Sequence, residues 1–170
     1  CQTTLLGILS AGNSNAMIVP YLASDDEVDF LQNSLGVKVS RLTTSLTALG
    51  NIILANDNGA IVHPKLRETT MKSIESILGV KVVAGKIGGI GLVGSSAVTT
   101  RKGALVSPKA TDEELDRISD VLGVPVSVGS VNRGVSFVRS GLVATSSGAA
   151  AGRETTGPEL DRIEEAFELV

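Results

Sequence analysis

A pattern that recurs about every 44 residues limits this chain to folds built from repeated units. The prolines of Val19-Pro20, His63-Pro64 and Ser107-Pro108 stand 44 residues apart. The segment Leu-Gly-Val-Lys-Val at 35–39 returns at 78–82, and it returns as Leu-Gly-Val-Pro-Val at 122–126. Independent markers at one period are the signature of a repeat architecture, in which each unit buries its apolar face against its neighbours.

Each repeat predicts the same order of elements, ββαβ. In the best-marked copy, residues 51–55 and 60–64 predict a hairpin around the turn at 56–59. An amphipathic helix follows, and a short valine-rich strand ends the unit. The apolar helix faces are Val28, Leu31 and Leu35; Met71, Ile74 and Leu78; Leu115, Ile118 and Leu122; and Leu160, Ile163 and Phe167. Leu-Gly at 6–7 and 49–50, Val-Gly at 93–94 and Ser-Gly at 140–141 mark the expected starts of the hairpins.

The helix ends are also marked in the sequence. Three helices are expected to begin at a capping box, which pairs Ser24 with Glu27, Thr111 with Glu114 and Thr156 with Glu159. Arg67 and Thr70 hold those places in the second copy and offer no such pair. Three helices are expected to end at Gly36, Gly79 and Gly123.

We therefore predict an α+β fold, in which one repeat-built domain at 1–170 forms a closed ring with sheets inside and helices outside. Four units are expected at about 8–50, 51–93, 94–140 and 141–170. Residues 1–7 take the place of the strand that ends a preceding unit. Because the helix of that unit is missing, we expect the chain to be truncated rather than processed.

The composition limits which ligands, metals and cellular locations are expected for the chain. A formal net charge of −3 gives no global electrostatic reason for the chain to bind nucleic-acid phosphates, so no DNA partner is expected. One cysteine and one histidine cannot form a disulfide framework or a Cys/His zinc cluster, and we expect neither metal nor cofactor. Residues 1–24 are uncharged, but polar residues and Pro20 interrupt them, so no membrane span is predicted. The lone cysteine and the absence of a leader favour the cytoplasm.

No convincing catalytic set emerges. The glycines of Gly89-x-Gly91-x-x-Gly94 fit a dinucleotide-binding pattern, but the β-prone residues 95–100 follow, so no helix is expected to open there. His63 holds the place of Val19 and Ser107 in the sister repeats, which favours a structural or surface histidine. Cys1 could act as a nucleophile only beside a positioned base.

Polar residues at the unit boundaries are more informative. The repeat symmetry predicts that they share one rim of the ring. The alternative for each residue alone is that it simply forms a turn. These candidates are Asn51, Ser95, Asn132, Arg133, Phe137 and Arg139, with Arg41 as an addition from the strand after a helix. Phe137 and Arg139 offer an anchor, because binding hot spots favour aromatic residues and arginine.

With these motifs in hand, the chain resembles the translation initiation factor 6 family, and in particular its archaeal type. The residues that carry the resemblance include Gly12-Asn13-Ser14-Asn15, Thr47-Ala48-Leu49-Gly50-Asn51, Gly59-Ala60-Ile61-Val62-His63-Pro64, Val131-Asn132-Arg133-Gly134 and the segment 155–160. The resemblance implies the pentein fold, five ββαβ units around a pseudo-fivefold axis, of which the first is largely absent here. Ala16 and Phe137 depart from the family pattern.

The resemblance also implies a function and a site. It implies a monomeric, non-enzymatic factor that binds a ribosomal protein on the intersubunit side of the large ribosomal subunit, near the sarcin–ricin loop, and blocks the small subunit. Gly50 and Asn51 match the family's interface, and Gly7, Gly94, Ser95 and Phe137 are their neighbours by repeat position. Two alternatives stay open: a catalytic pentein that acts on guanidino substrates through Cys1 and His63, and a scaffold that binds another partner through the same rim.

Overall fold

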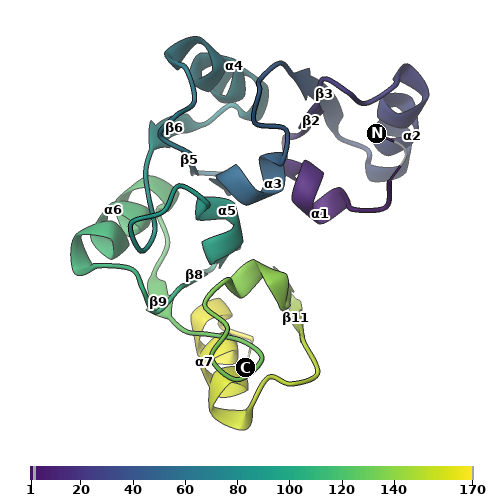
Figure 1. The fold of residues 1–170 in the computed structure, drawn as a ribbon. Helices are drawn as coiled ribbons and strands as arrows, with labels where there is room; N and C mark the ends of the chain where they lie inside the picture. The colour runs from purple at the N-terminus through teal and green to yellow at the C-terminus, as the bar shows by residue number, and fades with distance from the viewer. Residues whose placement is uncertain (2, 170) are drawn as a thin grey trace.

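Four successive units, each with a β-hairpin and a helix, make up the computed structural model, which describes residue 1 and residues 3–169 (Figure 1). The first unit contains β1 (Ala11–Gly12), β2 (Ala16–Pro20), α2 (Asp25–Leu35) and β3 (Lys38–Leu42). β1 and β2 pair antiparallel, and β3 returns after the helix to pair parallel with β2.

The next two units repeat this order, and the fourth repeats part of it. The second contains β4 (Ile53–Ala55), β5 (Gly59–Val62), α4 (Glu68–Leu78) and β6 (Lys81–Ala84). The third contains β7 (Ala97–Thr99), β8 (Ala104–Val106), α6 (Asp112–Leu122) and β9 (Val126–Val128). The fourth contains β10 (Leu142–Thr145), β11 (Gly148–Ala151) and α7 (Gly157–Phe167), with no third strand in the described residues. The predicted α+β class is confirmed, whereas four separate sheets form and closure of a ring stays a prediction.

A single helical turn precedes each hairpin, and the sequence analysis missed all four. These turns are α1 (Leu6–Leu9), α3 (Leu49–Ile52), α5 (Val93–Ser96) and the 3₁₀ turn η1 (Val138–Ser140). The expectation that residues 95–100 open no helix was wrong for Ser95 and Ser96, which end the four-residue helix α5, whereas β7 follows directly at Ala97 as the β-prone sequence predicted. Elements of four residues are too short to show helical periodicity in a sequence.

The strand expected at 1–7 does not form in the described residues of that segment, 1 and 3–7. Residues 3–5 carry no strand, and α1 begins at Leu6. A strand needs a neighbour that accepts its backbone hydrogen bonds, and the described residues supply no sheet of a preceding unit for it to join.

The predicted helix ends are confirmed. Capping boxes open α2, α6 and α7, and the N-cap of α4, Arg67, makes no side-chain hydrogen bond. Gly36, Gly79 and Gly123 end their helices in the left-handed region, with φ of 67°, 70° and 61°. Glycine suits this backbone because it has no Cβ to clash with the following carbonyl.

Each of the last three long helices packs against the sheet of the unit before its own. α4 contacts β2 and β3, α6 contacts β5, and α7 contacts β8 and β9. The hydrophobic clusters accordingly cross unit boundaries: Ile18 and Leu42 of the first unit share a cluster with Ile74 and Leu78 of the second. No residue of α2 is buried. The core of this fold therefore lies between units rather than within them.

Asparagines in the hairpin turns tie the units together. Asn13 Nδ2 donates to the carbonyl of Leu78 at 3.0 Å, at the C-terminus of α4. Asn56 Nδ2 makes the equivalent bond to the carbonyl of Leu122 at 2.8 Å, at the end of α6. The last carbonyls of a helix have no partner within the helix, so these bonds both satisfy them and fix the next unit in place.

Candidate functional site

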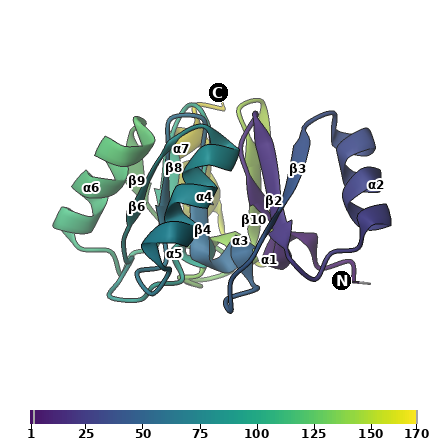
Figure 2. The ribbon, with the colours of Figure 1, turned by 90° about the horizontal axis from the view of Figure 1, so that it is seen from above.

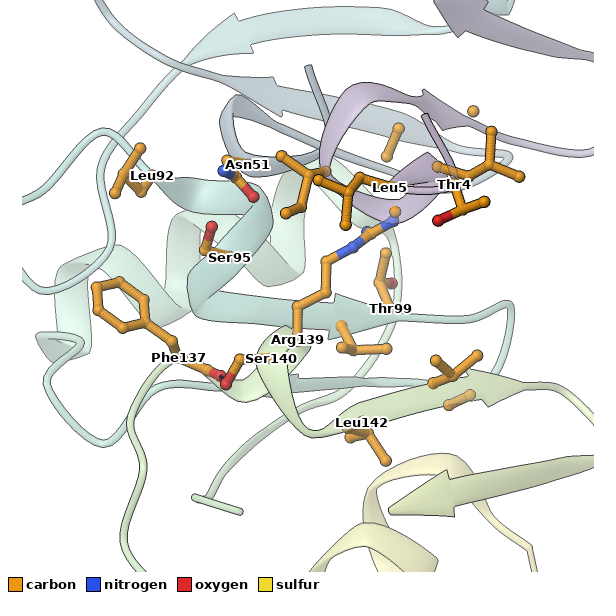
Figure 3. Close-up of a pocket in the computed structure, with 18 residues that line it drawn as sticks. Thr4, Leu5, Asn51, Leu92, Ser95, Thr99, Phe137, Arg139, Ser140 and Leu142 are labelled. Atoms are coloured by element: carbon orange, nitrogen blue, oxygen red, sulfur yellow. Dashed lines mark hydrogen bonds between the residues drawn. The ribbon is translucent and has the colours of Figure 1, made fainter. Parts of the chain in front are cut away.

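A cavity of about 930 Å³, which we call the axial cavity, lies where the four units meet (Figure 3). It is bordered by the segments that precede each hairpin: Leu5 just before α1, Asn51 on α3, Leu92 and Ser95 at α5, and Phe137 and Arg139 at η1. Figure 2 shows α1, α3 and α5 at one end of the molecule. The single helical turns thus bring residues far apart in sequence to one opening.

Two glycines allow the single turns to stack. A Cβ at Gly50 would lie 2.0 Å from the carbonyl oxygen of Gly7, and a Cβ at Gly94 would lie 2.2 Å from that of Gly50. Both glycines are buried. They therefore shape the predicted rim from beneath and present no surface of their own, which corrects the expectation that they lie on it.

The structure brings together half of the predicted rim residues. Gly7, Asn51, Ser95, Phe137 and Arg139 line the axial cavity. Arg41 lies elsewhere: its Nε donates to the carbonyl of Ala23 at 2.6 Å and its Nη2 to Asp25 Oδ1 at 2.7 Å, beside the start of α2. Alternate residues of a strand face opposite sides, so Arg41 shares the face of β3 with Val39, which packs against Val19 and Ala23.

Asn132 and Arg133 also lie outside the lining, in a tight loop that the fourth unit holds in place. Both have positive φ, of 48° and 62°. The Oδ1 of Asn132 accepts from Glu154 N at 3.2 Å, and Arg133 N donates to Glu159 Oε2 at 3.1 Å. Their polar groups serve the loop itself, which is the turn-forming role that competed with a rim role in the sequence.

Glu159 organises this loop and the start of α7. Its carboxylate accepts from Thr156 N at 2.8 Å, from the Ser130 hydroxyl at 2.7 Å and from Gly134 N at 2.9 Å. Burial alone would raise the pKa of Glu159, but these hydrogen bonds favour the charged form more strongly and lower the pKa to about 2. The sequence analysis found Glu159 only as a capping residue.

Apart from Phe137, the sequence analysis missed the apolar residues of the cavity. Leu5, Leu92, Phe137 and Val143 line the cavity and are exposed. Three of them directly precede a single helical turn, so a repeat alignment in the register of the structure would have grouped them. In that register Val138-Arg139, and not Ser140-Gly141, matches Leu6-Gly7, Leu49-Gly50 and Val93-Gly94, because all four pairs open a single turn. The cavity therefore combines an apolar wall with a few polar groups.

A second hollow, of about 320 Å³, lies at the hairpin turns and holds a closed polar network. Arg101 Nε donates to Asp57 Oδ2 at 2.6 Å, and Arg101 Nη2 donates to Ser14 Oγ at 2.8 Å. Burial would raise the pKa of Asp57, but hydrogen bonds from Ser14 N and from Arg101 outweigh it and the pKa is lowered. These groups satisfy one another, which indicates a link between three units.

Cys1 and His63, the residues of the alternative catalytic hypothesis, contact different units. Cys1 packs against the cluster of Val19, Ala23 and Val39 in the first unit. His63 Nδ1 accepts from Lys65 N at 3.0 Å, and its ring lies against Gly91. Within the described part of the chain, no group of three or more His, Cys, Asp or Glu could hold a metal ion, and no helix is long and apolar enough to cross a membrane.

Comparison with known proteins gives this geometry a context. The model of the eIF-6 family matches residues 1–166. A "Translation initiation factor 6" of Thermococcus onnurineus is 44% identical over 141 residues, which cover 80% of this chain and 62% of that protein. The Methanopyrus kandleri protein of the same name is 48% identical over 88 residues, 52% of this chain and 39% of that protein. A "Eukaryotic translation initiation factor 6" of Neurospora crassa is 41% identical over 102 residues, 56% of this chain and 42% of that protein. The matches span less than two thirds of the length of these relatives.

Proposed function

The chain belongs to the eIF-6 family, and from this premise we propose that it is a translation initiation factor that binds the large ribosomal subunit and keeps the small subunit from joining it. The proposed partner surface is a ribosomal protein on the intersubunit side, with a minor contact to ribosomal RNA near the sarcin–ricin loop. The block is steric, needs no catalysis or cofactor, and acts in the cytoplasm. The proposal includes a five-unit pentein ring for the whole protein.

One observation carries the site of this proposal: Asn51, Ser95 and Phe137 come from three consecutive units and line one opening. An aromatic side chain beside polar groups is the composition of an interface anchor. A stable protein–protein contact needs roughly 800 Å² on each partner, which a surface spanning several units can supply. We propose that the axial cavity and its border face the ribosomal protein.

Co-sedimentation with purified large and small ribosomal subunits tests the proposal. We expect the chain to pellet with the large subunit and to reduce the formation of joined subunits. When the small subunit alone is pelleted, the chain should stay in the supernatant. The binding should weaken little with salt, because protein contacts dominate. A loss of about a thousandfold or more between 50 and 200 mM salt, as for a protein that contacts many phosphates, would contradict this.

The variant Asn51→Asp tests the position of the interface. It places a negative charge at the mouth of the cavity, and we expect large-subunit binding to weaken about tenfold or more while the unfolding midpoint in urea stays unchanged. Asn51 is half-buried on α3 and its side chain makes no hydrogen bond in the described chain, which keeps the cost to folding small. Unchanged binding would move the interface away from this opening.

The two alternatives make different predictions. A catalytic pentein acting on guanidino substrates would need Cys1 beside a base, and no observation favours it. Turnover of an arginine-like substrate that Cys1→Ser abolishes would support that reading. If the chain is a scaffold for another partner, it should stay in the supernatant when either ribosomal subunit is pelleted.

A further inference from the structure

The single turn of the fourth unit departs from the other three at its second residue. The second residue of α1, α3 and α5 is a glycine, Gly7, Gly50 or Gly94, whereas the second residue of η1 is Arg139. At Gly50 and Gly94 any Cβ would lie within 2.7 Å of carbonyl oxygens of the neighbouring unit. The 3₁₀ turn of the fourth unit carries a long side chain at the position where Gly50 and Gly94 have no room for a Cβ.

The Arg139 side chain extends across the axial cavity toward Thr4 and Leu5 of the first unit (Figure 3). Among the described residues that line the cavity, Arg139 is the one that carries a charge. Its guanidinium makes no hydrogen bond or ion pair with any described residue. Burial lowers the pKa of Arg139, as expected for a cation with no facing anion, although an arginine stays charged at neutral pH.

We propose that Arg139 binds a carboxylate of the protein partner inside the axial cavity. The inference deepens the proposed function and rests on it. A half-buried cation without a partner lacks the compensation that buried charges have in proteins, and a carboxylate supplies it through two parallel hydrogen bonds to the guanidinium. The occupant is thus an acidic side chain or a chain terminus flanked by apolar residues.

The lining favours a carboxylate on a protein over a phosphate on RNA. Proteins that bind a nucleic-acid backbone use several cations along it, and here one arginine stands among neutral residues. Leu5, Leu92 and Phe137 offer apolar contacts that a polypeptide segment can match and a phosphodiester backbone cannot.

The first experiment measures the affinity for purified large ribosomal subunits. A charge-assisted pair contributes enough that Arg139→Gln should weaken binding about tenfold to a hundredfold. Arg139→Lys should lose less, because it keeps the charge without the planar fork. Arg153→Gln removes the same charge from a side chain of the fourth unit that is 94% exposed, and it should bind as the parent does. Equal affinities for Arg139→Gln and the parent would overturn the inference and leave the proposed function standing.

The second experiment does not depend on the ribosome. The Nε–H resonance of Arg139 is followed by ¹⁵N NMR while an acetylated, amidated peptide with one glutamate between two leucines is added. We expect a saturable shift, none with the matched glutamine peptide, and none with the glutamate peptide in Arg139→Gln. A shift with the glutamate peptide in a chain that does not bind large subunits would refute the proposed function and keep the carboxylate site. No shift with the acidic peptide, or a larger one with a short RNA hairpin, would overturn the inference.

Discussion

The helices α2 and α4 have the same length and the same place in their units, yet one is buried and the other is not. Leu78 in the last turn of α4 is 0% exposed, whereas Leu35 at the same repeat position of α2 is 53% exposed. Phe30 on α2 is 70% exposed. α4 lies on the sheet of the unit before it, and the described residues contain no unit before α2. An amphipathic helix in this fold therefore gains its core from its neighbour.

At the C-terminal end of the chain it is a sheet, rather than a helix, that lacks a neighbouring unit. In each of the first three units, strands of the sheet contact the helix of the following unit: β2 and β3 contact α4, β5 contacts α6, and β8 and β9 contact α7. The sheet of the fourth unit has no following helix in the described chain, and Val143 on β10 is 70% exposed. Stability in such an architecture resides in the contacts between neighbours, as in solenoid proteins.

The largest test of this contrast is a matched pair of leucine truncations. Leu78→Ala should reduce the free energy of unfolding by about 2–5 kcal/mol, because it leaves a cavity in a core shared by two units. Leu35→Ala removes the same atoms from a half-exposed site and should cost less than about 1 kcal/mol. Urea denaturation followed by circular dichroism measures both. Similar losses for the two variants would show that α2 and α4 are buried alike.

A second pair compares the packing of the single helical turns. Gly50→Ala introduces a methyl group against the carbonyl oxygens of Gly7 and Ser10, so the first two units must move apart. Overpacking of this kind costs about 1–3 kcal/mol. Gly7→Ala meets nothing within 4 Å and should leave the unfolding midpoint nearly unchanged. Thermal denaturation measures the unfolding midpoint of both variants. A larger decrease for Gly7→Ala than for Gly50→Ala would contradict this difference in packing.

The smallest expected effect concerns the fourth unit and its dependence on pH. The pKa of Glu159 is about 2 in the fold against 4.5 ordinarily, so its charged form stabilises the fold. That contribution is complete above pH 4.5 and is lost as the pH falls through the range from 4.5 to 2. Glu159→Gln should therefore lower stability at pH 7 and flatten the decline in acid, measured as the urea midpoint at each pH. An unchanged acid profile in the variant would assign the decline to other carboxylates.

Local signals allowed much of the fold to be predicted. The capping boxes at Ser24, Thr111 and Thr156, the left-handed glycines after the helices and the ββαβ order all depend on a few neighbouring residues. The candidate site was harder to predict, because it depends on contacts between units. The burial of Gly50 follows from its distance to Gly7, which lies 43 positions earlier. The match between Arg139 and the glycines appears only once η1 fixes the register of the fourth repeat.

The dependence of each helix on the preceding unit also sets an order of assembly during synthesis. A ribosome makes the chain from its N-terminus, so the strands β2 and β3 are complete before α4 emerges, and β8 is complete before α7 emerges. Each newly made helix from α4 onward finds its acceptor surface already present. From α4 onward, the apolar face of each new helix can therefore dock as soon as the helix emerges, which limits the apolar surface available for aggregation.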